Sequence, residues 1–308
     1  MSAPTRTNTP DGSVPSVTPP YTPPTQAAPP VSSRGTSGRA VIAIVALVVI
    51  VPVMLCAGIA LFAGSVGLFM ATHQVEETAT SQFQFAVPTH PTISVFDTAG
   101  QVTITNGAVK QVSVIATKRA QATGSTVARQ VLDGIKVTAV PTANGVRVDA
   151  TTSQGHPLAQ QSVDLRITVP QTSDLNVTIT AGTLQISSIS GLFTVVDTAG
   201  TVDLQNVTLQ AQSTINVSSG TFDFDGTLAT HAAVAVTVAT GTAAITLPQT
   251  SPTHLDAATQ VGSVTVSGWP ATITQSGVGR STVFDLNPQP TSTLTVRVDV
   301  GTITVAAR

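Results

Sequence analysis

Charged residues are scarce in this 308-residue chain, at 9% Asp, Glu, Lys and Arg against an average near ~25%. The formal net charge of −2 argues against a general nucleic-acid binder, which would show clustered Lys and Arg. The single cysteine, Cys56, excludes an intrachain disulfide and a cysteine-based metal site. The stability of the fold must therefore come from packing and backbone hydrogen bonds.

Sequence patterns of catalytic chemistry are also missing. The chain has no Gly-x-Ser-x-Gly elbow, and Gly277-Val-Gly279 lacks the rest of a nucleotide-binding fingerprint. The histidines show no metal-ligand spacing; they include His90, His156, His231 and His254. We expect a non-enzymatic protein and assign no catalytic, cofactor-binding or metal-ligating residue.

One stretch carries no charge at all. From Ala40 to Met70 every residue is uncharged, and about 20 apolar residues cross the ~30 Å hydrocarbon core of a bilayer. We predict a single transmembrane helix at residues 40–72, with residues 40–70 in contact with lipid. Arg34 and Arg39 precede the span, so the positive-inside rule predicts a cytoplasmic N-terminus and an extracellular C-terminal domain in the cell membrane.

Composition divides the rest of the chain. Residues 1–39 are rich in Pro, Thr and Ser and are expected to form a disordered cytoplasmic tail, because they cannot bury enough apolar surface. Residues 73–90 are expected to be a juxtamembrane linker. An irregular N-terminal β lobe with a short helix is predicted at residues 91–170, and a repetitive β-solenoid at residues 171–308.

The solenoid prediction rests on a phrase that recurs in the second half of the chain: glycine, Thr or Ser, apolar, any residue, apolar. The phrase begins at Gly182, Gly200, Gly220, Gly241, Gly262 and Gly301. The first four steps are 18, 20, 21 and 21 residues, and the last is 39, close to two further steps. A period near ~20 residues made of alternating strand pieces is typical of a chain that coils and stacks on itself.

Each position of the phrase has a structural role. Alternation sends Val202 and Leu204 to one face and Thr201 and Asp203 to the other. Turns stacked ~4.8 Å apart would pair their backbones and enclose the apolar face. Glycine permits a corner with positive φ, and the residue after it would form an outer Thr/Ser ladder. The tetrapeptide Asp97-Thr-Ala-Gly100 returns at Asp197-Thr-Ala-Gly200, which predicts the same corner twice.

The arrangement of a strand ending at Pro170, the strand pair around Gly182 and the successive glycine phrases resembles the bacterial "putative adhesin" or toast-rack family of single-span envelope proteins. The likeness covers roughly residues 90–308. It implies a mainly β protein with a β-solenoid ectodomain of about 20 residues per turn, and a role in adhesion or envelope-stress sensing. It implies no catalytic residues.

Two charge features remain open. Asp203 and Asp223 occupy the same place in adjacent turns, with Asp225 on the same face; a solvated face, a cation site and a glycan-cleaving pair are the alternatives. The stretch from Lys110 to Pro170 holds seven basic and three acidic residues. Such a lobe would contact anionic lipid or wall polymer, or would be ordinary surface charge.

These observations favour a membrane-anchored surface protein, adhesin-like or structural, that presents its solenoid outside the cell. The alternatives are an envelope-stress sensor that signals through the tail and, less favoured, a carbohydrate-active enzyme. The expected partners are the lipid bilayer and a cell-surface or wall glycan or protein, without nucleic acid and without a cofactor.

Overall fold

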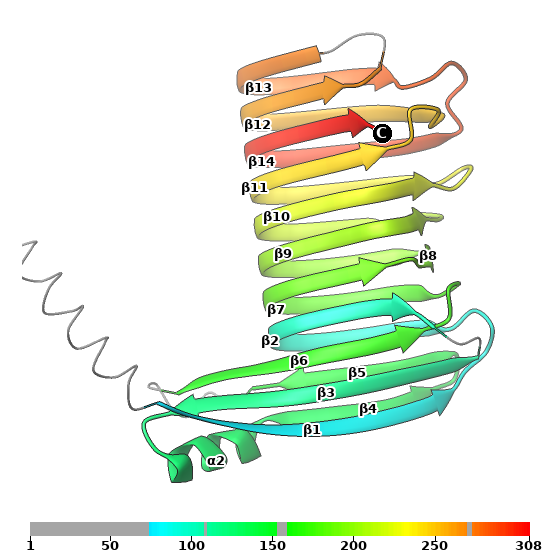
Figure 1. Ribbon diagram of the computed structural model, residues 1–308. Helices are drawn as coiled ribbons and strands as arrows, with labels where there is room; N and C mark the ends of the chain where they lie inside the picture. The colour runs from blue at the N-terminus through cyan, green and yellow to red at the C-terminus, as the bar shows by residue number, and fades with distance from the viewer. Residues whose placement is uncertain (1–73, 108–109, 153–158, 270–272) are drawn as a thin grey trace, which may run out of the picture. The chain divides into compact units, whose positions relative to one another are not determined.

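The computed structural model describes residues 74–107, 110–152, 159–269 and 273–308 (Figure 1). The predicted tail at 1–39 and the predicted transmembrane helix at 40–72 lie outside these residues. Within the described ranges, no helix has both the length and the apolar character needed to span a bilayer.

The described chain is mainly β, with one short helix. In order, its elements are β1 Val75–Ala86, β2 Thr92–Asn106, β3 Gln111–Ala122, α2 Ser125–Gly134, β4 Lys136–Thr142, β5 Gly145–Thr151, β6 Gln160–Val169, β7 Asp174–Ser187, β8 Ser190–Gly191, β9 Phe193–Leu209, β10 Thr214–Leu228, β11 Ala233–Leu247, β12 Thr253–Ser267, β13 Ile273–Asp285 and β14 Ser292–Ala307. They form one mixed sheet in the order β1-β3-β6-β2-β7-β9-β10-β11-β14-β12-β13, with β5, β4 and β8 attached at its side.

The long strands fold over at their glycines, so that each contributes two segments to the stack (Figure 1). Strand β2 shows this in its pairing: residues 92–97 pair with β5, whereas residues 102–106 pair with β6. Both segments pair with β7, in parallel. The architecture is therefore the solenoid-like stack that the recurring phrase predicts, with two strand layers facing each other.

The core lies between the two layers and follows the predicted alternation. In β7, Leu175, Val177 and Ile179 before the glycine and Leu184 and Ile186 after it are all at most 1% exposed. Each turn alone would leave these side chains in water, so burial requires the neighbouring turns. The alternation of side chains within each strand and the recurrence of the glycine phrase between strands together determine which residues form the core.

The glycines stack directly on one another. The register pairs Gly100 with Gly182, then continues through Gly200, Gly220 and Gly241, to Gly301 and Gly262. Six of these seven have φ between 143° and 148°, and Gly200 is the exception. A Cβ at any position from Gly182 onward would overlap the carbonyl oxygen of the glycine in the neighbouring turn. Close approach of the backbones is therefore the shared requirement, while positive φ applies to six turns.

The N-terminal end of the stack differs from the sequence expectation. Residues 75–86, assigned above to a linker, form β1 and pair antiparallel with β3. Alternating Phe83 and Phe85 pack against the core, which explains why this segment adds a strand. The short helix is present as α2 and contacts β1 and β3. Strand β2, placed above in the irregular lobe, belongs to the regular stack through Gly100.

The C-terminal end differs in order. The step of 39 residues before Gly301 does not add turns beyond β12. Instead, β14 lies between β11 and β12, parallel to both, with Gly301 opposite Gly241 and Gly262. Strand β13 pairs antiparallel with β12 and ends the stack. The last strand of the chain is therefore inserted two strands inside the end of the stack, beneath β12 and β13 (Figure 1).

Candidate functional site

The outward face of the strand segments after the glycines presents side chains in rows. One row, called the polar row below, runs through five neighbouring strands. The register joins its members in the order Arg166, Thr103, Gln185, Asp203 and Asp223. Because every strand is held in register by the glycine column, the spacing along the row is set by the ~4.8 Å distance between strands.

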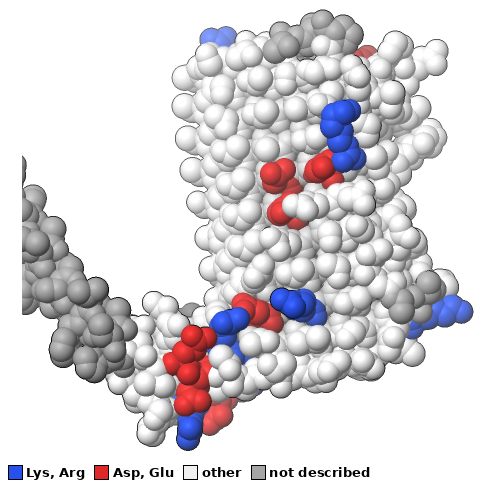
Figure 2. All heavy atoms as spheres, in the orientation of Figure 1, with Lys and Arg blue, Asp and Glu red and all other residues white. Residues whose placement is uncertain are grey.

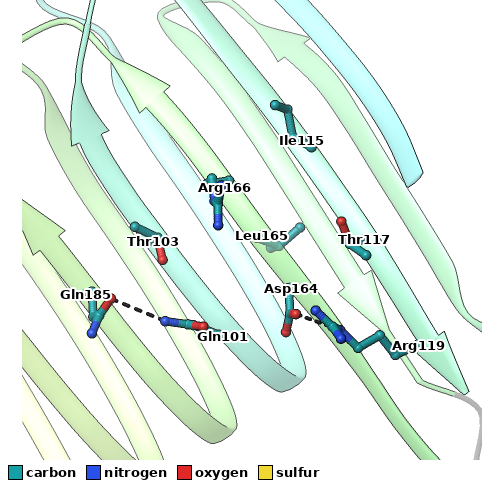
Figure 3. A pocket seen from close by; sticks show the side chains of 9 residues that line it. All are labelled: Gln101, Thr103, Ile115, Thr117, Arg119, Asp164, Leu165, Arg166 and Gln185. Carbon is teal, nitrogen blue, oxygen red and sulfur yellow. Dashed lines mark hydrogen bonds and ion pairs between the residues drawn. The ribbon is translucent and has the colours of Figure 1, made fainter. Parts of the chain in front are cut away.

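A hollow of about 440 Å³ opens on this face at the N-terminal end of the row. It lies over β3, β6, β2 and β7 (Figure 3). Its lining is mostly polar and consists of Gln101, Thr103, Ile115, Thr117, Arg119, Asp164, Leu165, Arg166 and Gln185. The volume falls within the ~300–1,000 Å³ range of small-ligand sites.

The two arginines of the hollow differ in their partners. Arg119 donates from Nε to Asp164 Oδ2 at 2.9 Å, and its Nη1 lies 3.4 Å from Glu76 Oε1. The hydrogen bond to Asp164, and then its charge, raises the pKa of the Arg119 guanidinium. Arg166 is exposed, and among the described residues it has neither an ion pair nor a hydrogen bond. One guanidinium in the hollow is therefore available.

The amides of the hollow are partly engaged. Gln101 Nε2 donates to Gln185 Oε1 at 3.2 Å, as the dashed line in Figure 3 marks. This bond uses one donor and one acceptor, so the Gln101 carbonyl oxygen and the Gln185 amino group remain free for other partners. The hydroxyls of Thr103 and Thr117 lie on the same lining. Donors and acceptors thus surround the free guanidinium.

The acidic residues singled out in the sequence lie together at the other end of the row. Asp203 pairs in register with Asp223, and Asp225 lies opposite Gln205. Burial first, and then the charges of Asp203 and Asp225, raise the pKa of Asp223. Asp225 forms an ion pair with Arg308, and Gln205 donates to Asp203 at 2.9 Å. Two of the three carboxylates thus have partners of their own.

A divalent cation would need a denser set of ligands. Within the described ranges, no group of three or more His, Cys, Asp and Glu side chains has a geometry that would hold a metal ion. Figure 2 shows that most charged side chains on the visible face gather in two places, one in the middle of the stack and one at its lower end, separated by uncharged surface. The acidic residues therefore form an open surface group.

The basic lobe is less basic than its composition indicates. Arg119 pairs with Glu76 and Arg129 with Glu77, two carboxylates that the count of seven basic and three acidic residues did not include. Lys118 donates to the backbone carbonyl of Ile135 at 2.7 Å. Glu76 and Glu77 come from β1, a segment that the sequence indicated to be a linker. The sequence therefore gave no reason to count their negative charges with those of the lobe.

The repeated Asp-Thr-Ala-Gly segments bury two carboxylates at the corner. Asp97 and Asp197 are 0% and 1% exposed, and no hydrogen bond to their carboxylate oxygens is present in the described part of the chain. Burial raises the pKa of Asp97 to about 7, against a smaller opposing effect of the Ala99 and Thr98 backbone. Burial likewise raises the pKa of Asp197 to about 6.

Sequence reasoning missed both the free arginine and the buried aspartates. Arg166 lies in an alternating strand and was counted only as one charge of the lobe. The signal for the aspartates was available, because both precede a glycine of the column by three residues, where Ile179, Val217 and Val238 stand in other turns. The last turns place Val298 and a buried Thr259 in the same column, so the two aspartates are its only ionisable residues and mark a buried charge.

The comparison with solved structures finds low-identity likenesses. A "putative cell adhesion protein" from Clostridium sporogenes is 12% identical, with a TM-score of 0.41, over 75% of this chain and 100% of the other. A "putative adhesin" from Bacteroides fragilis is 12% identical, with a TM-score of 0.25, over 74% of this chain and 97% of the other. A "Putative lipid binding protein" from Parabacteroides distasonis is 9% identical, with a TM-score of 0.24, over 73% and 96%.

Values this low carry no argument about what this chain binds. No curated protein matches the sequence. The family assignment rests instead on a sequence match over residues 89–306, described as Toastrack DUF4097. That range begins just before β2, ends within the last residues of β14 and includes the whole glycine column, so the match and the fold agree. The chain belongs to the Toastrack DUF4097 family.

Proposed function

We propose that this chain is a non-enzymatic surface protein, anchored by residues 40–72, that presents its stacked sheet to a partner outside the cell. The observation that carries the proposal is the row arrangement of the outward face, in which the glycine column holds polar side chains at a constant spacing. A rigid strand surface suits contact over an area, whereas catalysis needs a pocket that excludes water. The family match over residues 89–306 takes in the whole glycine column that holds this surface.

A carbohydrate-active enzyme is the less favoured alternative. Glycoside hydrolases place two carboxyl groups ~5–9.5 Å apart on either side of a bound sugar. Asp203 and Asp223 are neighbours on one open face, so both approach a ligand from the same side. Asp203→Asn and Asp223→Asn variants of the full chain should leave any glycan release at the background level of the unmodified protein.

The experiment that tests the proposal measures topology and needs no ligand. The full chain carries an epitope tag at the C-terminus in bacterial cells, and intact cells are treated with a protease that does not cross the membrane. We expect loss of the C-terminal tag and protection of an N-terminal one, with both in the membrane fraction. Deletion of residues 40–72 should release the protein from that fraction. A protected C-terminal tag in intact cells would contradict the proposal.

A second deletion distinguishes surface presentation from envelope-stress sensing. Removal of residues 1–39 leaves the span and the sheet intact. If the chain only presents a surface, the truncated protein should bind its partner and leave the cellular response to envelope damage unchanged. A response lost with the tail, while surface binding persists, would favour the sensor.

A further inference from the structure

The free guanidinium of the hollow is the strongest unassigned feature of the described chain. Arg166 lies between Thr103 of β2 and Ile115 of β3 in the register. The charged groups that line the hollow are two guanidiniums and one carboxylate, and that carboxylate, Asp164, is bonded to Arg119. An anion that enters the hollow therefore meets one arginine without competition from an internal partner.

A second hollow on the molecule provides an internal comparison. It lies beside β2, β5 and β7 and contains Arg147. There the guanidinium holds Asp149 through three hydrogen bonds, from Nε to Oδ2 at 2.8 Å and to Oδ1 at 3.1 Å, and from Nη2 to Oδ1 at 3.0 Å. That fork is saturated by its own carboxylate. The same arrangement is what an acidic ligand would supply to Arg166.

We propose that the hollow lined by Arg166, Thr103, Gln101 and Gln185 binds a carboxylate-bearing sugar of an acidic polysaccharide. The planar guanidinium of Arg166 receives the carboxylate in a bidentate geometry. The free amide groups of Gln101 and Gln185 and the hydroxyls of Thr103 and Thr117 pair with the ring hydroxyls. A site of about 440 Å³ holds one or two sugar units and leaves the polymer free to continue into solvent. The role of this ligand outside the cell rests on the proposed function, but the binding itself does not.

The charge pattern around the hollow favours a sugar over a membrane. A flat anionic surface laid on this face would meet Arg166 and also Asp203 and Asp223, which lie three and four strands further along the same polar row. At ~4.8 Å per strand, these carboxylates stand about 14 and 19 Å from Arg166, within the footprint of a bilayer. Like charges would oppose such contact. A single acidic sugar in the hollow reaches the arginine alone.

The test measures binding of oligogalacturonate to the full chain in detergent by calorimetry, at low and moderate salt. Arg166→Gln removes the charge from an exposed side chain, so the fold should be retained, which circular dichroism checks. We expect this variant to weaken binding at least about tenfold, because a charge-assisted hydrogen-bonded contact is lost. Gln185→Leu should weaken it by a smaller factor. The matched control is Lys136→Gln, which removes an exposed positive charge from β4, outside both hollows, and should leave binding unchanged.

Each other outcome overturns the inference. If the unmodified chain does not bind oligogalacturonate, the proposed sugar site is wrong. Equal weakening by Arg166→Gln and Lys136→Gln would mean unspecific attraction between charges. Equal binding of a neutral malto-oligosaccharide would show that the carboxylate is not recognised. Binding of phosphatidylglycerol vesicles to a version lacking residues 40–72, abolished by Arg166→Gln, would assign the arginine to a membrane surface. If the protease test shows the C-terminal domain outside the cell but the chain does not bind oligogalacturonate, only the ligand proposal is contradicted and the proposed function stands.

Discussion

The two halves of the stack use the same glycine phrase in different ways. From β7 to β11 the turns follow one another in chain order, with Gly182, Gly200, Gly220 and Gly241 in successive layers. Beyond β11 the order becomes β14, β12, β13, although Gly301 and Gly262 keep the same register. The phrase thus determines how two turns align when they meet. It does not determine which turns meet.

The inner faces of the last strands explain the order. Strand β14 is apolar throughout its inner face and needs a neighbour on both sides; its buried residues are Leu294, Val296, Val298, Ile303 and Val305. Strand β13 places Gln275 and Arg280, which remain partly or fully exposed, opposite Val264 and Thr259 of β12. Polar side chains at these positions cannot be covered by a further apolar layer without loss of hydration. The strand with polar inner positions therefore ends the stack, and the apolar strand lies inside it.

Removal of β14 would test this difference most strongly. A chain that ends before Ser292 loses five buried side chains, worth together on the order of 10 kcal/mol from ~2 kcal/mol each, which is comparable with a whole domain's stability. We expect β12 and β13 to unfold. Trp269, the only tryptophan, is 6% exposed, so its fluorescence should shift to longer wavelength. An unshifted spectrum would mean that β12 pairs directly with β11, in the chain order that the period alone predicts.

Substitution of the stacked glycines compares the two halves position by position. In Gly241→Ala and Gly301→Ala the new Cβ would overlap the carbonyl oxygen of the adjacent glycine, and both positions have positive φ. Each substitution should lower the free energy of unfolding by about 3 kcal/mol, measured by urea titration of the full chain. Gly124→Ala, where no atom lies within 4 Å of the added Cβ, is the control. If Gly241→Ala lowers the free energy of unfolding and Gly301→Ala leaves it unchanged, β14 does not lie within the stack.

The buried aspartates make stability depend on pH. The pKa of Asp197 is raised from 3.8 in the unfolded chain to about 6 in the fold, so the native state binds the proton more tightly. Its favourable contribution is fully present below pH 3.8 and is lost as pH rises toward 6. Asp197→Val, which restores the residue type of Val217 and Val238, should raise the free energy of unfolding by about 1–2 kcal/mol at pH 8.

The same variant should have little effect at pH 3.5, where the carboxyl is protonated in both states, and it should flatten the fall in stability between pH 4 and 6. Urea titrations at pH 3.5, 5 and 8 would measure this. Asp97, with its pKa raised to about 7, should leave a residual dependence at higher pH. Destabilisation by Asp197→Val at pH 8 would show that the carboxylate has a stabilising partner.

The smallest expected effect concerns the outer Thr ladder. Thr302 and Thr242 are joined by a hydroxyl hydrogen bond at 3.3 Å across the β11–β14 boundary. Thr302→Val removes this bond from an exposed strand position where valine is also favoured. We expect a change below about 0.5 kcal/mol in the free energy of unfolding. A larger loss would mean that the ladder contributes to holding β14 in place.

Much of the fold could be predicted because its information is local. Alternation around Gly182 or Gly220 is legible in five residues, and the recurrence of glycine indicates stacked turns. The buried state of Asp97 and Asp197 and the strand at Val75–Ala86 were missed for different reasons. The aspartates lie in a column of mostly apolar residues, which can be recognised only after the turns are aligned. The strand was interpreted as a linker because it directly follows the expected membrane span.

The candidate site was less predictable than the fold. Arg166, Gln101 and Gln185 come from three strands that are distant in sequence, and no local pattern joins them. The acidic residues were easier, because Asp203 and Asp223 stand at the same offset from their glycines and alignment of the repeats brings them together. Contacts between residues at equivalent positions of the repeats could be predicted. The hollow could not, because it is built partly from β3 and β6, which lie outside the repeat.

The amino-acid sequence alone determined the strand period, the glycine corners, the inner and outer faces, and the family, since each depends on residues close together in the chain or on their recurrence. The tertiary structure decided the insertion of β14, the ion pairing of the lobe by β1, and the freedom of Arg166. These depend on which of several equally well aligned partners a strand or charge meets. That choice is made by burial and charge compensation over the whole stack, which no single repeat contains.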